Sequence, residues 1–305
     1  MILLCGIPSE PPLAQAIRAA EQARLAYVVF NQRQAGTDIT LEVSRGRATG
    51  TLTLRETHWP LDGFTGVYVR LMDWRMLPRN RSSDPAGVEK ARLLYETLDT
   101  WLEIAPSCRI CNRNGACASN QSKPFQAQAI QRAGLLTPET LVTNDPDAVL
   151  LFLEAHGRVV YKSISSVRSI VQELRPDQRA TLHRVRALPT QFQAFVPGTN
   201  VRVHVVGSEV FATEICSEAV DYRYAERDGR DVTMRAVTLP DDVEEKCVRL
   251  SRLLDLPLCG IDLKRTPEGV YYCFEVNPSP AYSYYQERTG QPVAQALVRY
   301  LAGAD

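Results

Sequence analysis

The sequence predicts a mixed fold that opens as α/β and continues as α+β. Short apolar runs at residues 2–5 and 26–30 flank a stretch with helical spacing at 13–24, which is the β-α-β order of a parallel sheet. After residue 192, strands of alternating polarity follow one another across short turns, as in an antiparallel sheet. A chain of 305 residues is long enough for two or three packed units, because a single core stops growing near ~250–300 residues.

The first unit is predicted to span residues 1–112. A polar alternating stretch at 39–54, with an Arg-Gly pair in its middle, indicates a hairpin, and the apolar run at 66–70 indicates an inner strand. Between residues 88 and 102 apolar side chains recur at three- and four-residue steps, which places them on one face of a long helix. These elements complete a small α/β unit.

The second unit is predicted at residues 113–190. A helix is expected over 124–133, and a strand over 140–143. Asp145 and the proline after it are the cap and first-turn residue of a helix that ends at Gly157. The apolar run at 159–162 then indicates another strand.

The third unit, residues 191–305, is predicted to hold an antiparallel sheet and its covering helices. Strands are expected at 201–206, at 210–215 and on both sides of a turn at 266–269, and helices at 241–254 and 292–301. The chain has no repeat at a fixed period and no low-complexity tract.

Composition excludes several classes of protein. Apolar residues make up 45% and charged residues 23%, as in ordinary globular proteins, so a disordered or fibrous chain is excluded. The 35 basic residues equal the 35 acidic ones, so we expect no broad nucleic-acid surface. No run approaches the ~18 apolar residues of a membrane span, and the N-terminus lacks a signal pattern. We therefore expect no membrane partner and a cytoplasmic location.

Three of the eight cysteines are close in sequence: Cys108, Cys111 and Cys117. They would be a zinc site if a fourth ligand stood at a suitable spacing, but no second close pair exists. We predict reduced, metal-free thiols and keep zinc as the alternative. The other five cysteines lie inside apolar runs and are expected to be buried: Cys5, Cys216, Cys247, Cys259 and Cys273.

Polar side chains cluster on the last predicted strand pair. If the turn at 266–269 joins the two strands, Asp262 lies opposite Cys273, and the period of two places Asp262, Glu275 and Asn277 on one face. Phe274 is expected on the opposite, apolar face. Two carboxylates and an amide oxygen are the hard ligands that magnesium takes together with nucleotide phosphates. The alternative is an ordinary exposed sheet face.

Cationic residues precede this cluster. Lys123 stands at a helix start, and Lys162 ends an apolar strand, although such lysines often only extend to solvent. Arg202 lies on the polar face of a strand whose neighbouring residues are valines, and its planar guanidinium suits a phosphate or a carboxylate. An apolar linker leads into that strand: Gln193, Ala194, Phe195 and Val196.

The order and spacing of Lys123, Lys162, the 193–196 linker, Arg202 and the Asp262/Glu275-x-Asn277 set resemble the ATP-grasp fold of the RimK type. The resemblance covers nearly the whole chain. Two longer segments are similar to the maturases that cross-link ribosomal peptides of the microviridin or graspetide kind. These segments are Val210-Phe-Ala-Thr-Glu-Ile with Asp221-Tyr-Arg, and Asn277-Pro-Ser-Pro-Ala-Tyr-Ser-Tyr-Tyr with Thr289-Gly.

The resemblance implies an N-terminal substrate-side domain and two lobes that enclose ATP. Lys123 and Lys162 would contact phosphates, and the backbone of the 193–196 linker would bind adenine. The resemblance assigns two Mg²⁺ ions to Asp262, Glu275 and Asn277. It places two arginines at the phosphoryl group and the carboxylate that receives it: Arg202 and Arg223.

Two positions depart from the family pattern. The loop after Lys162 has no glycine where many relatives carry a glycine-rich flap, so Ser165, Ser166 and Arg168 would contact the phosphates instead. Asn200 stands where glutamate ligases have an acidic residue, which leaves the ribose contact unassigned.

We therefore predict a ligase that activates a carboxylate as an acyl phosphate and joins it to an amine or hydroxyl, with a peptide or small carboxylate as substrate. The alternatives are a RimK-type ligase that adds a free amino acid, and a nucleotide-binding regulatory protein without turnover. A homodimer stays open. Four arginines near Trp74 are either a solvated loop or a dock for an acidic peptide: Arg70, Arg75, Arg79 and Arg81.

Overall fold

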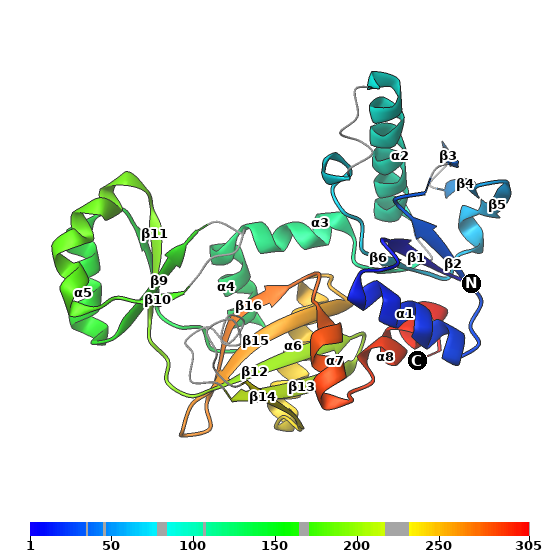
Figure 1. The fold of residues 1–305 in the computed structure, drawn as a ribbon. Coiled ribbons are helices and arrows are strands. Elements are labelled where there is room, and N and C mark those ends of the chain that lie inside the picture. The colour runs from blue at the N-terminus through cyan, green and yellow to red at the C-terminus, as the bar shows by residue number, and fades with distance from the viewer. Residues whose placement is uncertain are drawn as a thin grey trace.

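The computed structural model describes residues 1–34, 36–44, 47–77, 84–105, 108–164, 171–216 and 232–304. Its helices and strands form three parts, visible in Figure 1 as the blue N-terminal domain, the green central lobe and the C-terminal sheet between them. The mixed helix and strand class predicted from the sequence is confirmed. Across the described residues, none of the helices has both the length and the apolar character that crossing a bilayer requires.

The N-terminal domain is built on a parallel sheet in the order β2-β1-β6-β7. Its strands are β1 (Ile2–Gly6), β2 (Tyr27–Asn31), β6 (Gly66–Val69) and β7 (Arg109–Cys111). One face packs against α1 (Pro11–Gln22), and the other against α2 (Pro85–Ile104) through Leu98, Trp101 and Leu102. The β-α-β opening predicted from the sequence is thus confirmed.

A second, three-stranded sheet extends the N-terminal domain. It consists of β3 (Thr37–Ser44), β4 (Arg47–Leu54) and β5 (Thr57–Pro60), followed by the short 3-10 turns η1 (Leu61–Gly63) and η2 (Trp74–Met76). The predicted hairpin corresponds to β3 and β4, which pair in antiparallel fashion. Its Arg-Gly turn, residues 45–46, lies outside the described residues.

The central lobe is an antiparallel sheet in the order β10-β9-β11-β8. The strands are β8 (Thr140–Thr143), β9 (Val159–Ser163), β10 (Gln172–Glu173) and β11 (Thr190–Ala194). Two helical segments, α5 (Pro146–His156) and the 3-10 segment η5 (Pro176–Ala187), pack on one face around Phe192. As predicted, α5 begins behind Asp145, whose side chain accepts a hydrogen bond from the Asp147 amide.

The C-terminal sheet is antiparallel, in the order β14-β13-β12-β15-β16. Its strands are β12 (Thr199–Val206), β13 (Glu209–Cys216), β14 (Thr233–Val237), β15 (Leu258–Arg265) and β16 (Tyr271–Asn277). One face packs against α4 (Lys123–Arg132) and α6 (Asp241–Leu253). Two short elements, α3 (Asn114–Cys117) and η4 (Ala118–Gln121), connect the N-terminal domain to α4.

The opposite face of the C-terminal sheet is covered by α7 (Tyr282–Thr289) and α8 (Val293–Ala302). Apolar residues of α8, such as Leu297, also pack against α1 and the first strand. The N-terminal domain and the C-terminal sheet therefore share one core, so α8 fixes their relative placement.

The pairing of β15 with β16 corrects one prediction. Asp262 lies opposite Glu275, not Cys273, because the connecting turn is longer by one residue and a β-bulge follows Asp262. The extra residue is Phe274, which leaves the core face, whereas Cys273 takes a core position and is fully buried. The shared face of Asp262, Glu275 and Asn277 is nevertheless preserved.

Candidate active site between the central lobe and the C-terminal sheet

Three charged residues meet on the face of the C-terminal sheet opposite its α4 and α6 core. Arg202 on β12, Asp262 on β15 and Glu275 on β16 occupy directly paired positions of three neighbouring strands. Arg202 Nη1 donates to Asp262 Oδ1 at 2.6 Å. The pleat therefore places a cation and two carboxylates side by side.

The second carboxylate is paired with a lysine from another element. Lys123, in the first turn of α4, donates from Nζ to Glu275 Oε2 at 2.9 Å and to Asn120 Oδ1 at 3.2 Å. Burial by itself would raise the pKa of Glu275, but the positive charges of Lys123, Lys162 and Arg202 lower it below its ordinary value. Glu275 is thus held as a carboxylate among three cations.

The place of Lys123 is set by local contacts of α4. Ser122 is the N-cap residue and accepts a hydrogen bond from the Phe125 amide at 3.4 Å. One turn on, the buried side chain of Gln126 donates to Val276 O at 2.7 Å and accepts from Val276 N at 3.2 Å. These two bonds fix α4 to β16 next to Glu275. Spacing gives no signal for a glutamine of this kind, and the sequence reasoning missed it.

Lys162 belongs to the central lobe and lies on the face of its sheet opposite α5. It is 9% exposed and shares its sheet face with Gln191, directly opposite on β11, and with Gln193. All three polar side chains are buried and turn toward the C-terminal sheet rather than toward the apolar core of the lobe. Gln191 was missed in the sequence, although the period of two from Gln193 would have found it.

The 193–196 linker leaves the central lobe at the end of β11. The Ala194 amide donates to Glu139 O and the Phe195 amide to Arg158 O, each at 2.9 Å. The Gln193 side chain donates to Thr140 Oγ1 at 3.0 Å. The linker backbone is therefore held by β8 and by the start of β9.

Two cationic side chains lie near the ring of Phe195 in the linker. The sequence did not point to either of them. The guanidinium carbon of Arg158 is 3.7 Å from the ring centroid, and Lys264 Nζ is 5.5 Å away. Lys264 also lies 5.8 Å from the ring of Phe274, the bulge residue. Burial, and then the charge of Arg158, lower the pKa of Lys264.

The position of the Arg202 side chain depends on a glycine. Gly260 lies opposite His204 on the neighbouring strand, and a Cβ at Gly260 would stand 1.9 Å from Nη2 of Arg202. Arg202 is 6% exposed, and its guanidinium carbon lies 5.7 Å from the ring centroid of Tyr285 on α7. Only glycine leaves room for this position of the guanidinium.

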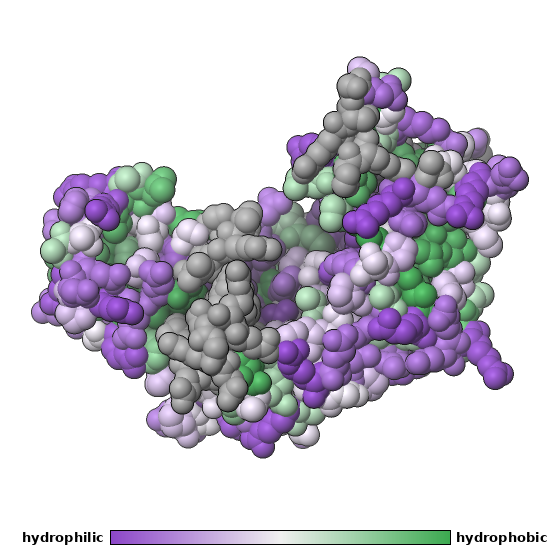
Figure 2. Space-filling model, viewed as in Figure 1, coloured by the Kyte–Doolittle hydropathy of each residue, from purple (hydrophilic) through white to green (hydrophobic). Residues whose placement is uncertain are grey.

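Cavities adjoin both sides of the site. One of about 450 Å³ lies between α4, the central sheet and β16, with Lys123, Gln191, Gln193 and Phe274 in its lining. Another, of about 520 Å³, lies between the N-terminal domain and the loop after Asn277. In the space-filling view, the surface is hollowed between the central lobe at the left and the N-terminal domain at the right (Figure 2).

The larger cavity is lined mainly by residues of the N-terminal domain, both apolar and polar. Its ionisable side chains are Glu10, Arg33, Arg70, Tyr95, Asp99 and Cys117. Burial raises the pKa of Asp99. Arg70 contacts Glu10 rather than standing free as expected of a peptide dock, and exposed Arg75 is 2.7 Å from Asp73.

Several predicted residues lie outside the described part of the chain. These are Ser165, Ser166, Arg168, Arg223, Arg79 and Arg81. Within the described part, no three His, Cys, Asp or Glu side chains come together as a metal-binding group. The oxygen-bearing side chains predicted for this sheet face are the two carboxylates of Asp262 and Glu275 and the carboxamide of Asn277.

Comparisons with known proteins agree with this architecture. The chain is 23% identical over 200 residues to a probable alpha-L-glutamate ligase of Vibrio atlanticus, a match that covers 62% of this chain and 66% of that protein. A RiPP-associated ATP-grasp ligase of Chryseobacterium gregarium, solved with ADP and a leader and core peptide, is 20% identical with a TM-score of 0.82. That alignment covers 100% of this chain and 97% of the other.

The macrocyclase MdnC of Microcystis aeruginosa, solved with precursor peptide MdnA, is 21% identical with a TM-score of 0.76 over 100% of both chains. These structures share the fold, which confirms the ATP-grasp fold expected from the sequence. A family model described as the RimK-like ATP-grasp domain matches residues 119–301, well over half of the chain. The chain belongs to the RimK-like ATP-grasp family.

Proposed function

We propose that this protein is an ATP- and magnesium-dependent ligase that activates a carboxylate as an acyl phosphate and joins it to an amine or hydroxyl of a peptide. The observation that carries the proposal is the charge arrangement around Glu275. Three cations from three different elements, Lys123, Lys162 and Arg202, lower the pKa of one half-buried carboxylate. A site with separate anionic and cationic walls suits a metal-bound polyphosphate.

The residues on the sheet face fit magnesium by their chemistry. Asp262, Glu275 and Asn277 offer only oxygen atoms, and the two carboxylates meet as cross-strand partners. When bound, Mg²⁺ would neutralise phosphate charge and hold the phosphate oxygens. In this proposal, Lys123 gives up the Glu275 carboxylate that it contacts in this structure and turns toward phosphate, whereas Arg202 keeps its place beside Asp262.

The remaining residues have distinct roles in the proposal. Lys123 and Lys162 bind phosphate oxygens. Because the amides of Ala194 and Phe195 already donate within the described part of the protein, the linker would present the Val196 amide to the adenine edge. The resemblance further assigns Ser165, Ser166 and Arg168 to the phosphates.

The proposed reaction has two displacement steps. A carboxylate oxygen attacks the terminal phosphorus of ATP, and ADP leaves with the bridging oxygen. The amine or hydroxyl then attacks the carbonyl carbon, phosphate leaves, and the proton of the nucleophile passes to phosphate or solvent. Arg202, with Arg223 by resemblance, would hold the carboxylate and the transferred phosphoryl group in place.

A peptide substrate is supported by the cavity of about 520 Å³ beside Asn277. Its lining combines apolar residues with charged side chains of both signs, which suits a peptide segment. The solved relatives named above hold leader, core or precursor peptides, in line with this choice. A homodimer and a cytoplasmic location stay predictions of the sequence.

The test is to follow ADP release with acidic peptides that carry Ser, Thr or Lys, and separately with free glutamate and other amino acids. The proposal expects ADP release with a peptide, and loss of one water from the peptide for each bond formed, seen by mass spectrometry. ADP release with free amino acids alone would instead favour the glutamate-ligase reaction named for the Vibrio relative.

A further inference from the structure

Arg70 has an unusually complete set of contacts for a residue outside the charged face. It directly follows β6, and its side chain is 9% exposed. A Cβ at Gly6 would lie 2.6 Å from Arg70 O, so the ends of the first and sixth strands approach closely here. This close approach fixes the backbone from which the Arg70 side chain extends.

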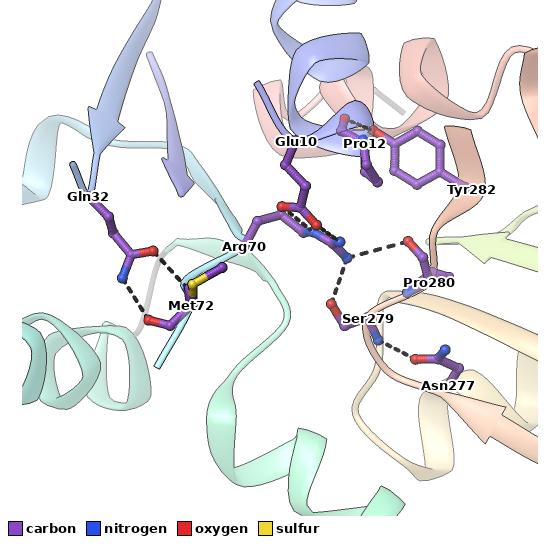
Figure 3. Close-up of polar contacts among 9 residues, drawn as sticks. All are labelled: Glu10, Pro12, Gln32, Arg70, Met72, Asn277, Ser279, Pro280 and Tyr282. Carbon is purple, nitrogen blue, oxygen red and sulfur yellow. Dashed lines mark hydrogen bonds and ion pairs between the residues drawn. The ribbon is translucent and has the colours of Figure 1, made fainter. Parts of the chain in front are cut away.

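The guanidinium joins two distant segments of the chain (Figure 3). Its Nε and Nη2 donate to the two carboxylate oxygens of Glu10, next to α1, with Nε at 3.2 Å from Oε2. Its Nη1 donates to Ser279 Oγ at 2.6 Å and to Pro280 O at 3.4 Å. All three nitrogens are thus committed to protein partners.

Ser279 in turn contacts a proposed magnesium ligand. Its amide donates to Asn277 Oδ1 at 2.9 Å (Figure 3). A carboxamide oxygen has two lone pairs, so one is held by Ser279 and the other stays available to a cation. The orientation of the Asn277 side chain therefore depends on the position of Ser279.

A second buried side chain holds the same loop. Asn112, 5% exposed, donates to Pro278 O at 2.6 Å and accepts from Leu258 N at 3.1 Å. Leu258 begins β15, the strand of Asp262. The N-terminal side thus contacts residues 278, 279 and 280 in turn, at the point where the metal strand ends.

We infer that Arg70 is a positioning residue that sets the metal affinity of the site through Ser279 and Asn277. The inference rests on the proposed function, because it concerns the proposed magnesium ligands. This role differs from both roles that the sequence left open for Arg70, a solvated loop residue and a dock for an acidic peptide. To bind a substrate carboxylate, Arg70 would first have to release Glu10 or Ser279.

The test measures metal binding without turnover. Arg70→Lys keeps the charge but loses the planar fork that contacts Glu10 and Ser279 together. Mn²⁺ is titrated into the protein with ADP, and free Mn²⁺ is followed by electron paramagnetic resonance. We expect Mn²⁺ affinity to fall about 10-fold or more, within the range for residues that orient metal ligands. ADP affinity measured in EDTA should stay unchanged, whereas a general loss of structure would lower it.

Two further variants keep the test decisive. Ser279→Ala removes only an exposed hydroxyl and should weaken Mn²⁺ binding in the same direction, even if Arg70→Lys fails to fold. Arg75→Ala is the control, since Arg75 is exposed and, within the described part of the protein, forms its ion pair with Asp73. Wild-type Mn²⁺ affinity in both Arg70→Lys and Ser279→Ala would overturn the inference.

Asp262→Asn distinguishes a failure of the inference about Arg70 from a failure of the proposed magnesium site. If Asp262→Asn loses Mn²⁺ binding while Arg70→Lys retains it, the positioning role of Arg70 is wrong and the metal site stands. If Asp262→Asn binds Mn²⁺ like the wild type, the magnesium assignment itself is wrong.

Discussion

Arg202 and Asp262 face each other across β12 and β15 with 2.6 Å between Nη1 and Oδ1. The side chain of Arg202 is 7% exposed and that of Asp262 is 29% exposed. The ion pair therefore links a buried cation to a carboxylate that solvent can reach. Through this contact, the residue proposed to orient the phosphoryl group is positioned by a proposed magnesium ligand.

Gly260→Ala tests whether Arg202 acts from its observed position. The added Cβ would stand 1.9 Å from Nη2, so the guanidinium must leave its position against Asp262. Turnover should fall on the order of 100-fold, the cost of losing one group that stabilises charge in the transition state. Gly63→Ala is the matched control, because nothing lies within 4 Å of a Cβ there. Normal turnover in Gly260→Ala would show that Arg202 does not act from this position.

Lys123→Met and Lys162→Met test the phosphate contacts. Each change removes one charge-assisted hydrogen bond, so ATP binding should weaken by about 1.5–3 kcal/mol. Isothermal titration calorimetry measures the change. The control is Lys90→Met, since Lys90 is an exposed residue 2.8 Å from Asp38. ATP affinity equal to the wild type in both variants would reject the role.

The sequence identified the charged face but not its register. Alternation alone placed Asp262, Glu275 and Asn277 on one side, and this survives because side-chain period does not depend on which residues are paired. The partner of Asp262 does depend on the turn length and on the bulge at Phe274, and neither has a signal in a single sequence.

Contacts between distant segments of the chain could not be predicted from the sequence either. The sequence left Arg70 either in a solvated loop or in a dock for an acidic peptide. Its partner Glu10 could not be predicted, because it is 60 residues away in the chain. Asn112 and Gln126 bind the backbone of the strands that carry the acidic residues. A buried amide side chain has no characteristic spacing, so only the folded structure could reveal these two residues.

His204 predicts how stability depends on pH. Within the described residues, neither ring nitrogen has a hydrogen-bond partner, and burial, then the charge of Arg202, lower the pKa well below its usual 6.5. Below pH 6.5 the unfolded chain binds a proton at this residue that the folded protein does not. The free energy of unfolding should therefore fall as pH falls, by at most about 1.4 kcal/mol per pH unit from this group.

Urea unfolding of His204→Leu between pH 7.5 and 5 checks this dependence. The variant should have a shallower decline than the wild type, because it has no ring to protonate. His183→Leu, at an exposed position, should keep the wild-type slope. Equal slopes in His204→Leu and the wild type would contradict the prediction.

The cysteines are predicted to be reduced, metal-free and slow to react. Burial raises the pKa of Cys108 and of Cys117 to about 11, so few thiolates exist at neutral pH. The sequence wrongly predicted that Cys216 is buried, because its strand ends there at the edge of the described residues. Iodoacetamide should label Cys216 first, since it is the exposed cysteine among the described residues. Elemental analysis showing one zinc per chain, lost in Cys111→Ser, would refute the prediction.

Hydroxylamine trapping tests the central claim most directly. The protein is incubated with ATP, Mg²⁺, an acidic peptide and hydroxylamine, and the peptide is examined for a hydroxamate by mass spectrometry. The account predicts a hydroxamate on one peptide carboxylate, formed with ADP and phosphate, and none with Glu275→Gln. A peptide that is modified at the normal rate by Glu275→Gln, or bond formation that yields AMP and pyrophosphate instead of ADP, would contradict it.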